Sequence, residues 1–261
     1  IATMSSLSIA ANFILDQLTG CLARPLIAGI QGPQGSGKTF LASHLVQRLA
    51  ASDSNLRMVV LSIDDLYLPH SGLQAVARSH PENPLLRGRG QPGTHDVQLG
   101  LDLLTALHEG RTKVRLPSFD KSLFDGEGDR LPMDDRRVVV VEPPAVDVIV
   151  LEGWFIGFQP ISPELLDEKW ERVWKREEAR LGIPEGFCTK SNIAELNQNL
   201  VEYQALWDRL DIFIQASLSP IEPEDDEDSP YSIIYQWRLE QEHAMKALNG
   251  NRGMADEAVR Q

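Results

Sequence analysis

The sequence predicts an α/β protein of three layers, in which a mainly parallel sheet is flanked by helices. Apolar runs at residues 26–30, 58–63, 138–141 and 148–151 contain almost no polar positions, which is typical of strands covered on both faces. Segments with apolar residues at helical spacing lie between and after these runs. We expect one domain over residues 1–261, because no long low-complexity linker divides the chain.

The composition restricts the partners that the protein can have. The net charge of −13 and the isoelectric point of 4.9 give a surface that repels nucleic acid and anionic membranes. No apolar run reaches about 18 residues, and no basic region precedes an apolar core near the N-terminus, so we expect neither a membrane span nor a secretory signal. Cys21 and Cys188 are far apart, which favours free thiols in a reducing compartment and predicts a cytoplasmic protein.

A glycine-rich loop follows the first predicted strand. An opening helix is predicted at about residues 6–19, and the sequence at 32–39 then reads Gly-Pro-Gln-Gly-Ser-Gly-Lys-Thr before a helical run at 40–51. This strand, loop and helix form the setting in which Gly-x-x-x-x-Gly-Lys-Thr binds nucleotide phosphates. Backbone N–H groups and the helix dipole attract the phosphates, Lys38 adds a cation, and the Thr39 hydroxyl is suited to Mg²⁺. The residues predicted to hold the nucleotide are Gly32, Pro33, Gln34, Gly35, Ser36, Gly37, Lys38, Thr39 and Phe40.

Acidic residues follow two other predicted strands. Asp64 and Asp65 come after the run at 58–63, and Glu152 comes after the run at 148–151. Open α/β sheets bind ligands at the carboxyl ends of their strands, so Glu152 is a candidate to order Mg²⁺ together with Thr39. Successive residues of an extended chain point in opposite directions, so we expect only one of the two aspartates to face the site. The alternatives are caps or turn residues for the pair and a strand end without a metal for Glu152.

The chain between these strands contains further candidates. Residues 71–94 are rich in Gly, Pro, Arg and Asn, so we expect a loop without regular structure. Arg87 and Arg89 have two open interpretations, as ligands of an anionic group and as solvated side chains. Thr94 or Asp96 is predicted to cap a helix at 97–107, and Asp96 is also a candidate acceptor for a substrate hydroxyl.

The next segment ends in a polar turn. A short strand is predicted within residues 114–122, and its last residues include two more candidates for the site, Asp120 and Lys121. We expect residues 66–96 and 117–136 to form acceptor or lid loops.

The last third of the chain is predicted to be mainly helical. Helices are expected at residues 164–180, 193–210 and 229–246, with a strand at 212–214 and an acidic solvated loop at 222–228. Thr-Lys-Ser-Asn at 189–192 approaches a guanine-binding motif, but it ends in Asn and follows no clear strand, so we discount it. Arg238 has two open interpretations, as a contact of the transferring phosphoryl group and as a surface charge that pairs with Glu240 or Glu242.

Together these motifs resemble the D-glycerate 3-kinase family of plants and fungi, which is related to uridine kinase, phosphoribulokinase and pantothenate kinase. The resemblance covers about residues 25–255 and is carried by the glycine-rich loop, Ser-Ile-Asp-Asp-Leu-Tyr at 62–67, Arg-Gly at 87–88, Gly-Thr-His-Asp at 93–96, Pro-Ser-Phe-Asp-Lys-Ser at 117–122, Gly-Asp-Arg at 128–130, Leu-Glu-Gly-Trp at 151–154 and Tyr-Gln-Trp-Arg-Leu at 235–239. It implies the three-layer fold of P-loop NTPases with a lid, the use of ATP and Mg²⁺, Asp64 as the base and Glu152 as the acid near the metal. The candidate substrate contacts are Asp65, Tyr67, Arg87, Arg89, His95, Asp96, Asp120 and Lys121.

The resemblance predicts an ATP-dependent kinase for the hydroxyl of a small metabolite, with the conversion of D-glycerate to 3-phosphoglycerate as the first expectation. Lys38, Asp64 and Arg238 are the predicted catalytic residues. Two alternatives remain open. One is a kinase for another acceptor, such as a nucleoside, pantothenate or a sugar phosphate. The other is a non-catalytic ATP-binding switch protein.

Overall fold

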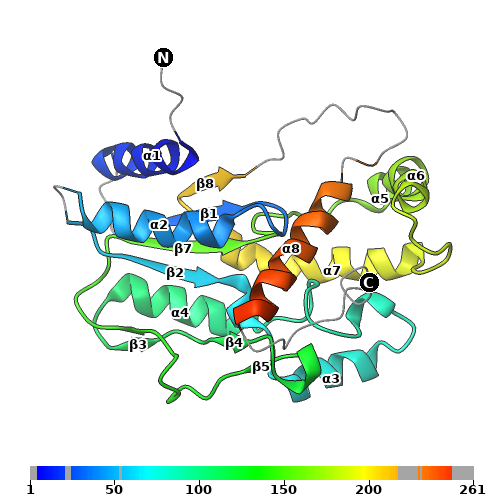
Figure 1. Ribbon diagram of the computed structural model, residues 1–261, viewed down its shortest axis with the longest axis horizontal. Coiled ribbons are helices and arrows are strands. Elements are labelled where there is room, and N and C mark those ends of the chain that lie inside the picture. Colours follow the sequence, from blue (N-terminus) through cyan, green and yellow to red (C-terminus); the bar gives the residue numbers. More distant parts are fainter. Residues whose placement is uncertain (1–4, 21–24, 53–54, 217–228, 230, 249–261) are drawn as a thin grey trace.

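The centre of the molecule is a four-stranded parallel sheet (Figure 1). The computed structural model describes residues 5–20, 25–52, 55–216, 229 and 231–248. The strands have the order β2-β7-β1-β8, with the bounds Met58–Ser62, Val148–Gly153, Leu26–Gln31 and Ile212–Gln215. The predicted fold class, a mainly parallel sheet flanked by helices, is confirmed.

Every residue of β1 and β7 is buried, because helices cover both faces of the sheet. On one face, Ile27 and Ile149 join a hydrophobic core beneath α4 (Val97–Glu109) and α7 (Lys190–Trp207); we call this the α4/α7 core. On the other face, Ala28 and Val150 join a core beneath α1 (Ser6–Gly20) and α2 (Lys38–Ala50), the α1/α2 core. The absence of polar positions in these strands follows from this double cover.

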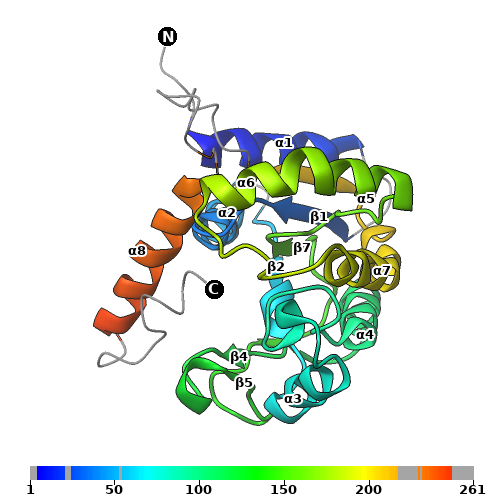
Figure 2. The ribbon, with the colours of Figure 1, turned by 90° about the vertical axis from the view of Figure 1, so that its right-hand side faces the viewer.

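The four strands end at one edge of the sheet, and three elements meet there. β1 continues into the glycine-rich loop and α2, and β2 continues into the 3₁₀-helix η1 (Ile63–Leu66). The helix α8 (Ser232–Leu248) lies across this edge, close to the loop (Figures 1 and 2). Gly35 has φ +79°, and a Cβ atom on it would lie 2.2 Å from Cβ of Trp237 in α8. Only glycine therefore allows the loop and α8 to approach this closely.

Short elements fill the space beyond η1 and beside α7. Two antiparallel ladders pair β3 with β6 and β4 with β5. Their bounds are Val114–Arg115, Val140–Val141, Phe119–Asp120 and Asp129–Arg130. The remaining helical elements are α3 (His70–Ser79), η2 (Pro84–Leu86), η3 (Phe124–Gly126), α5 (Pro163–Lys169), the π-helical turn η4 (Trp170–Trp174) and α6 (Lys175–Arg180).

Several predictions about single elements are wrong. The apolar run at 138–141 contributes only the two-residue strand β6, outside the main sheet. Val139, which precedes β6, is 57% exposed. Residues 71–94 were expected to lack regular structure, yet α3 covers residues 70–79 and buries Leu73, because the Gly- and Pro-rich composition begins only after residue 80. The apolar spacing of the run at 40–51 predicts Phe40 on the inner side of its helix, together with Leu41, Leu45 and Leu49, but 68% of Phe40 is exposed.

Other predictions are confirmed. The opening helix forms as α1, and Asp96 caps α4 by accepting a hydrogen bond from the Leu99 N–H at 3.0 Å. The discounted motif at 189–192 is a capping box at the start of α7. Cys188 is a buried free thiol. Cys21, the acidic run at 222–228 and the start of the predicted helix at Pro230 lie outside the described residues.

Within the described residues, no helix has the length and apolar character that crossing a membrane requires.

Candidate active site

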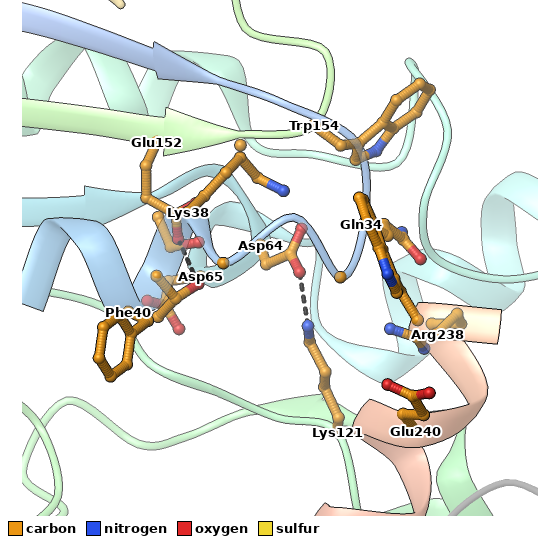
Figure 3. Close-up of a pocket in the computed structure, with 16 residues that line it drawn as sticks. Gln34, Lys38, Phe40, Asp64, Asp65, Lys121, Glu152, Trp154, Arg238 and Glu240 are labelled. Carbon is orange, nitrogen blue, oxygen red and sulfur yellow. Dashed lines mark hydrogen bonds and ion pairs between the residues drawn. The ribbon is translucent and has the colours of Figure 1, made fainter. Parts of the chain in front are cut away.

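The carboxyl edge of the sheet opens into a cavity of about 620 Å³ (Figure 3). The glycine-rich loop, the ends of β2 and β7, the turn after β4 and the helix α8 all contribute to its walls. The lining residues are Gln34, Gly35, Gly37, Lys38, Thr39, Phe40, Ser62, Asp64, Asp65, Lys121, Glu152, Gly153, Trp154, Trp237, Arg238 and Glu240. Segments that are far apart in the sequence therefore form one site, as expected for strands that end at a common edge.

The glycine-rich loop has a shape suited to an anion. Gly35 and Gly37 have positive φ angles of +79° and +81°, and α2 begins directly after them at Lys38. The Lys38 ammonium donates to the Pro33 carbonyl at 2.8 Å, and the buried Ser36 hydroxyl has no hydrogen-bond partner among the described residues. Burial lowers the pKa of Lys38, although Glu152 and Asp64 oppose this effect. The loop thus combines a helix N-terminus, a buried cation and an unused hydroxyl at one place.

The two aspartates after β2 both line the cavity, so the prediction that only one would face it is wrong. The chain leaves the strand at Ser62 and enters η1, where successive side chains no longer alternate. Asp64 accepts hydrogen bonds from the Tyr67 hydroxyl at 3.0 Å and from Lys121 Nζ at 2.5 Å. Asp65 instead accepts from the backbone N–H of Phe119 at 2.9 Å.

Their different partners give the two carboxyl groups opposite pKa shifts. Burial raises the pKa of Asp64, but the Lys121 charge, its hydrogen bond and the Tyr67 hydroxyl together outweigh burial and hold this pKa below its usual value. Burial also raises the pKa of Asp65, and with only a backbone hydrogen bond to oppose it this pKa reaches about 6. Both carboxyl groups are mainly ionised at neutral pH, but only Asp64 stays ionised well below pH 6, and it is the one that contacts a lysine.

Glu152 lies next to Thr39 at the end of β7. The Thr39 hydroxyl donates to Glu152 Oε1 at 3.4 Å, and Ser62, the register partner of Glu152 on β2, also forms a hydrogen bond with it. Burial raises the pKa of Glu152, although Ser62 and Lys38 oppose this effect. In the part of the chain that the structure describes, no group of three His, Cys, Asp or Glu residues is placed to hold a metal. The oxygen donors present fit Mg²⁺, which usually takes one or two protein ligands and completes its shell with phosphate and water.

Cations gather at the side of the cavity opposite β7. Lys121 points at Asp64 from the turn after β4, and Arg238 and Glu240 enter from α8 (Figure 3). Arg89 lies behind them, where its guanidinium donates to the carbonyls of Gly126 and Glu127 and stands 5.9 Å from the centre of the Phe119 ring. Burial is the main cause that lowers the pKa of Arg89, and the charge of Arg238 also lowers it. Two guanidinium groups thus lie within electrostatic reach of each other near Asp64.

Six predicted substrate contacts, including the Arg89 just described, do not line the cavity. Tyr67 and His95 are buried, and Arg87 is exposed. Asp96 accepts hydrogen bonds from the Leu99 N–H and from Arg130, and Asp120 accepts them from Ser122 and Arg137. For these two aspartates the observed partners support a structural role.

The sequence reasoning left four lining side chains out of the predicted site, namely Ser62, Trp154, Trp237 and Glu240. The indole N–H of Trp154 donates to the Gly90 carbonyl at 3.1 Å, and Trp237 packs on Gly35. A signal for two of them existed in the chain. Trp154 follows Glu152 at a strand end, and Trp237 is adjacent to Arg238, so the argument applied to those neighbours also applies to the tryptophans.

Comparisons with known proteins place this site in a family. No family model matches the chain. The uncharacterized kinase mug58 of Schizosaccharomyces pombe is 34% identical over 265 residues, which cover 98% of this chain and 84% of that protein. The chloroplastic D-glycerate 3-kinase of Arabidopsis thaliana is 32% identical over 240 residues, which cover 90% of this chain and 44% of that protein.

A solved structure shows the same relationship. The D-glycerate 3-kinase of Cryptococcus neoformans var. grubii matches with a TM-score of 0.79 and 38% identity, over 99% of this chain and 85% of that chain. Identity at this level over nearly the whole length, together with the phosphate loop and the sheet, establishes the relationship. The chain therefore belongs to the family of phosphate-loop kinases that includes D-glycerate 3-kinase.

Proposed function

We propose that the protein transfers the γ-phosphoryl group of ATP to the hydroxyl of a small hydroxy acid, with D-glycerate as the substrate and 3-phosphoglycerate as the product. The observation that carries the proposal is the pair formed by Asp64 and Lys121, with Lys121 Nζ 2.5 Å from Asp64 Oδ2 in the cavity that the phosphate loop also lines. A hydroxy acid offers a hydroxyl for the carboxylate and a carboxylate for the ammonium, only a few bonds apart.

The surroundings of this pair also favour an anionic acceptor. The protein as a whole has a net charge of −13, yet Lys121 and Arg238 line the cavity, and Arg89 lies within electrostatic reach of Arg238 and Asp64. The three cations are half-buried, and a carboxylate or phosphate is the group best suited to bind cations in such a place. A nucleoside would offer no negative group for them, whereas D-glycerate offers one. A protein that only binds and hydrolyses ATP has no need of such an acceptor pocket.

The residues of the chain have separate tasks in this reaction. Transfer of a phosphoryl group depends mainly on positioning and on neutralisation of charge. The loop N–H groups and Lys38 hold the β- and γ-phosphates of the donor. Asp64 orients the acceptor hydroxyl and takes its proton late in the transfer. Arg238 neutralises the negative charge on the phosphoryl group as it is transferred.

Thr39 and Glu152 would hold Mg²⁺ at the donor side of the cavity. When bound, the ion would supply positive charge that neutralises the phosphate groups of the donor. Glu152 is suited to this role because its buried carboxylate already lies against the Thr39 hydroxyl.

A screen for acceptor-dependent ATP consumption tests the proposal. Purified protein with ATP and Mg²⁺ is supplied in turn with D-glycerate, L-glycerate, uridine, pantothenate and ribulose 5-phosphate, and ADP formation is measured. We expect turnover with D-glycerate and a 3-phosphate product by ³¹P NMR. Lys38→Ala serves as the control for the phosphate loop and is expected to abolish turnover.

The other outcomes identify the alternatives. Turnover only with uridine, pantothenate or ribulose 5-phosphate would assign the kinase to that acceptor and overturn the glycerate proposal. Slow ATP hydrolysis that no acceptor accelerates would instead support an ATP-binding switch protein.

A further inference from the structure

Tyr67 occupies an unusual position behind the carboxylate of Asp64. Its ring is almost wholly buried, with 2% of the residue exposed, and it is not part of the cavity wall. Its hydroxyl, the one polar atom of the side chain, donates to Asp64 Oδ1 at 3.0 Å. Lys121 contacts the other oxygen of the same carboxylate at 2.5 Å. The two oxygens of Asp64 are therefore held by two different donors, one from the protein interior and one from the cavity.

The backbone of Tyr67 is fixed on both sides. Arg130 donates to the Tyr67 carbonyl from Nη2 at 2.7 Å and from Nε at 3.1 Å. On the other side Tyr67 forms an antiparallel bridge with His95, and the Leu68 N–H donates to the Thr94 carbonyl at 3.0 Å. A tyrosine with both its backbone and its hydroxyl fixed has little freedom to move away from Asp64.

The ring of Tyr67 is also held between two aromatic neighbours. It stacks on His95 with centroids 4.4 Å apart at 28°, and it meets Phe119 edge to face at 5.1 Å. Stacked and edge-to-face arrangements are the preferred geometries of aromatic pairs. The ring orientation that directs the hydroxyl at Asp64 is thus determined by packing.

His95 provides a neutral surface for this stacking. The Tyr203 oxygen accepts from the Gly93 N–H at 2.9 Å and shares a hydrogen bond with Nδ1 of His95, 2.8 Å away. The other ring nitrogen of His95, Nε2, is buried and has no partner among the described residues. Burial lowers the pKa of His95 to about 3, so the ring stays uncharged beside Asp64.

We propose that Tyr67 is a positioning residue, which fixes the rotation of the Asp64 carboxylate so that the oxygen shared with Lys121 faces the acceptor. This inference rests on the proposed function, because it gives Asp64 its role as the base. The Tyr67 hydroxyl itself makes no contact with substrate.

The first test measures Asp64 in the protein without ligands, so it does not depend on which acceptor is correct. The protein is labelled with ¹³C at the aspartate carboxyl carbons, and the Asp64 resonance is assigned with Asp64→Asn. Tyr67→Phe removes one hydrogen bond to the ionised form, so we expect the pKa of Asp64 to rise by about half a unit or more. The charged or titratable groups around Asp64 that stay in place are Lys38, Asp65, Arg89, His95, Lys121, Glu152 and Arg238.

Tyr203→Phe is the matched control. It removes a hydroxyl from a buried tyrosine in the same aromatic cluster, yet that hydroxyl forms hydrogen bonds with His95 and Gly93 and none with Asp64. We expect both variants to lose some thermal stability and only Tyr67→Phe to move the Asp64 titration. If the pKa of Asp64 were the same in Tyr67→Phe and in wild type, the inference would be overturned. Should Tyr67→Phe fail to fold, 3,5-difluorotyrosine at position 67 is a stronger donor and is expected to lower the Asp64 pKa.

Kinetics then connect the inference to turnover. With the acceptor identified by the screen, Tyr67→Phe is expected to lower kcat about tenfold with an unchanged KM for ATP, because a misdirected base affects transfer and leaves donor binding intact. Tyr203→Phe is expected to stay within about twofold of wild type. Equal kcat in the two variants would overturn the inference, whereas failure of wild type with every acceptor would overturn the proposed function and leave the NMR result standing.

Discussion

Two adjacent residues of the same type have opposite chemistry in this site. Asp64 and Asp65 both follow β2, but the Lys121 ammonium lowers the pKa of one, whereas burial raises the pKa of the other to about 6. Enzymes assign acid and base roles to carboxyl groups by such differences in surroundings. The choice between the two aspartates, which the sequence leaves to the resemblance alone, is supported here by the lysine on Asp64.

Replacement of Asp64 tests this assignment at the scale of one residue. Asp64→Asn keeps the shape of the side chain but removes its basicity, so we expect kcat to fall by about 100- to 10,000-fold while the Kd for ATP changes little. Turnover measures the first quantity and calorimetric titration of the nucleotide measures the second. Asp102→Asn, on the exposed face of α4, is the matched control and is expected to behave as wild type. Near-normal turnover by Asp64→Asn would exclude it as the base.

Asp65 leads to a prediction about stability and pH. Its pKa is raised to about 6 in the folded protein, so as pH rises from about 4 to 6 the unfolded chain loses this proton first and the folded state loses stability. Asp65→Asn removes this effect and still accepts the Phe119 N–H bond. Relative to wild type, we expect the variant to gain up to about 3 kcal/mol in unfolding free energy between pH 4 and pH 7.5.

Urea unfolding at these two pH values measures the difference, and both values lie away from the isoelectric point of 4.9. If the difference in unfolding free energy between Asp65→Asn and wild type were the same at both pH values, the raised pKa of Asp65 would be contradicted.

At the scale of elements, the contact between α8 and the glycine-rich loop closes the cavity. Gly35 and Gly37 have almost the same backbone conformation, but a Cβ atom on Gly35 would meet Trp237 at 2.2 Å, whereas a Cβ atom on Gly37 would meet nothing within 4 Å. Alanine at either position strains the loop equally, and only Gly35→Ala also pushes against α8. We expect Gly35→Ala to increase amide hydrogen exchange across α8 and Gly37→Ala to leave it unchanged. The same increase in both variants would show that loop strain, and not the contact, controls α8.

The elements that the sequence predicts well are those whose signal is local. The phosphate loop needs only its own glycines, Lys38 and the flanking strand and helix, and the caps at Asp96 and Thr189 need only the next few residues. By contrast, residues 138–141 have the composition of a strand buried in the main sheet, yet they contribute only the two-residue strand β6 to a separate ladder. The place next to β1 and β2 in the main sheet is taken by β7. Which segment pairs with β1 and β2 depends on the whole fold, so residues 138–141 alone do not predict it.

The same limit applies to the site. Lys121 and Arg238 were candidates from the sequence and both line the cavity, whereas the candidate Asp120, adjacent to Lys121, pairs with Arg137 and does not line it. The burial of Tyr67 and His95 behind Asp64 depends on the bridge between residues 67 and 95 and on contacts from α7. Such long-range pairs have no signature in one sequence.

At the scale of the whole molecule, the two hydrophobic cores are joined by the strands between them. β1 gives Ile27 to the α4/α7 core and Ala28 to the α1/α2 core, and β7 divides its residues in the same way through Ile149 and Val150. Loss of either core would expose one full face of both central strands. The candidate active site lies at the end of these same strands, so its geometry depends on both cores at once.

This arrangement predicts that the chain unfolds as one cooperative unit. Leu104→Ala removes packing from the α4/α7 core and Leu45→Ala removes it from the α1/α2 core, where the two leucines are 1% and 0% exposed. Each change is expected to lower the unfolding free energy by about 2–5 kcal/mol. Because both cores share β1 and β7, we expect the same single transition to shift in either variant, with calorimetric and van't Hoff enthalpies that agree. Scanning calorimetry that resolved two transitions, each moved by only one of the variants, would instead divide the chain into two units and contradict the single domain.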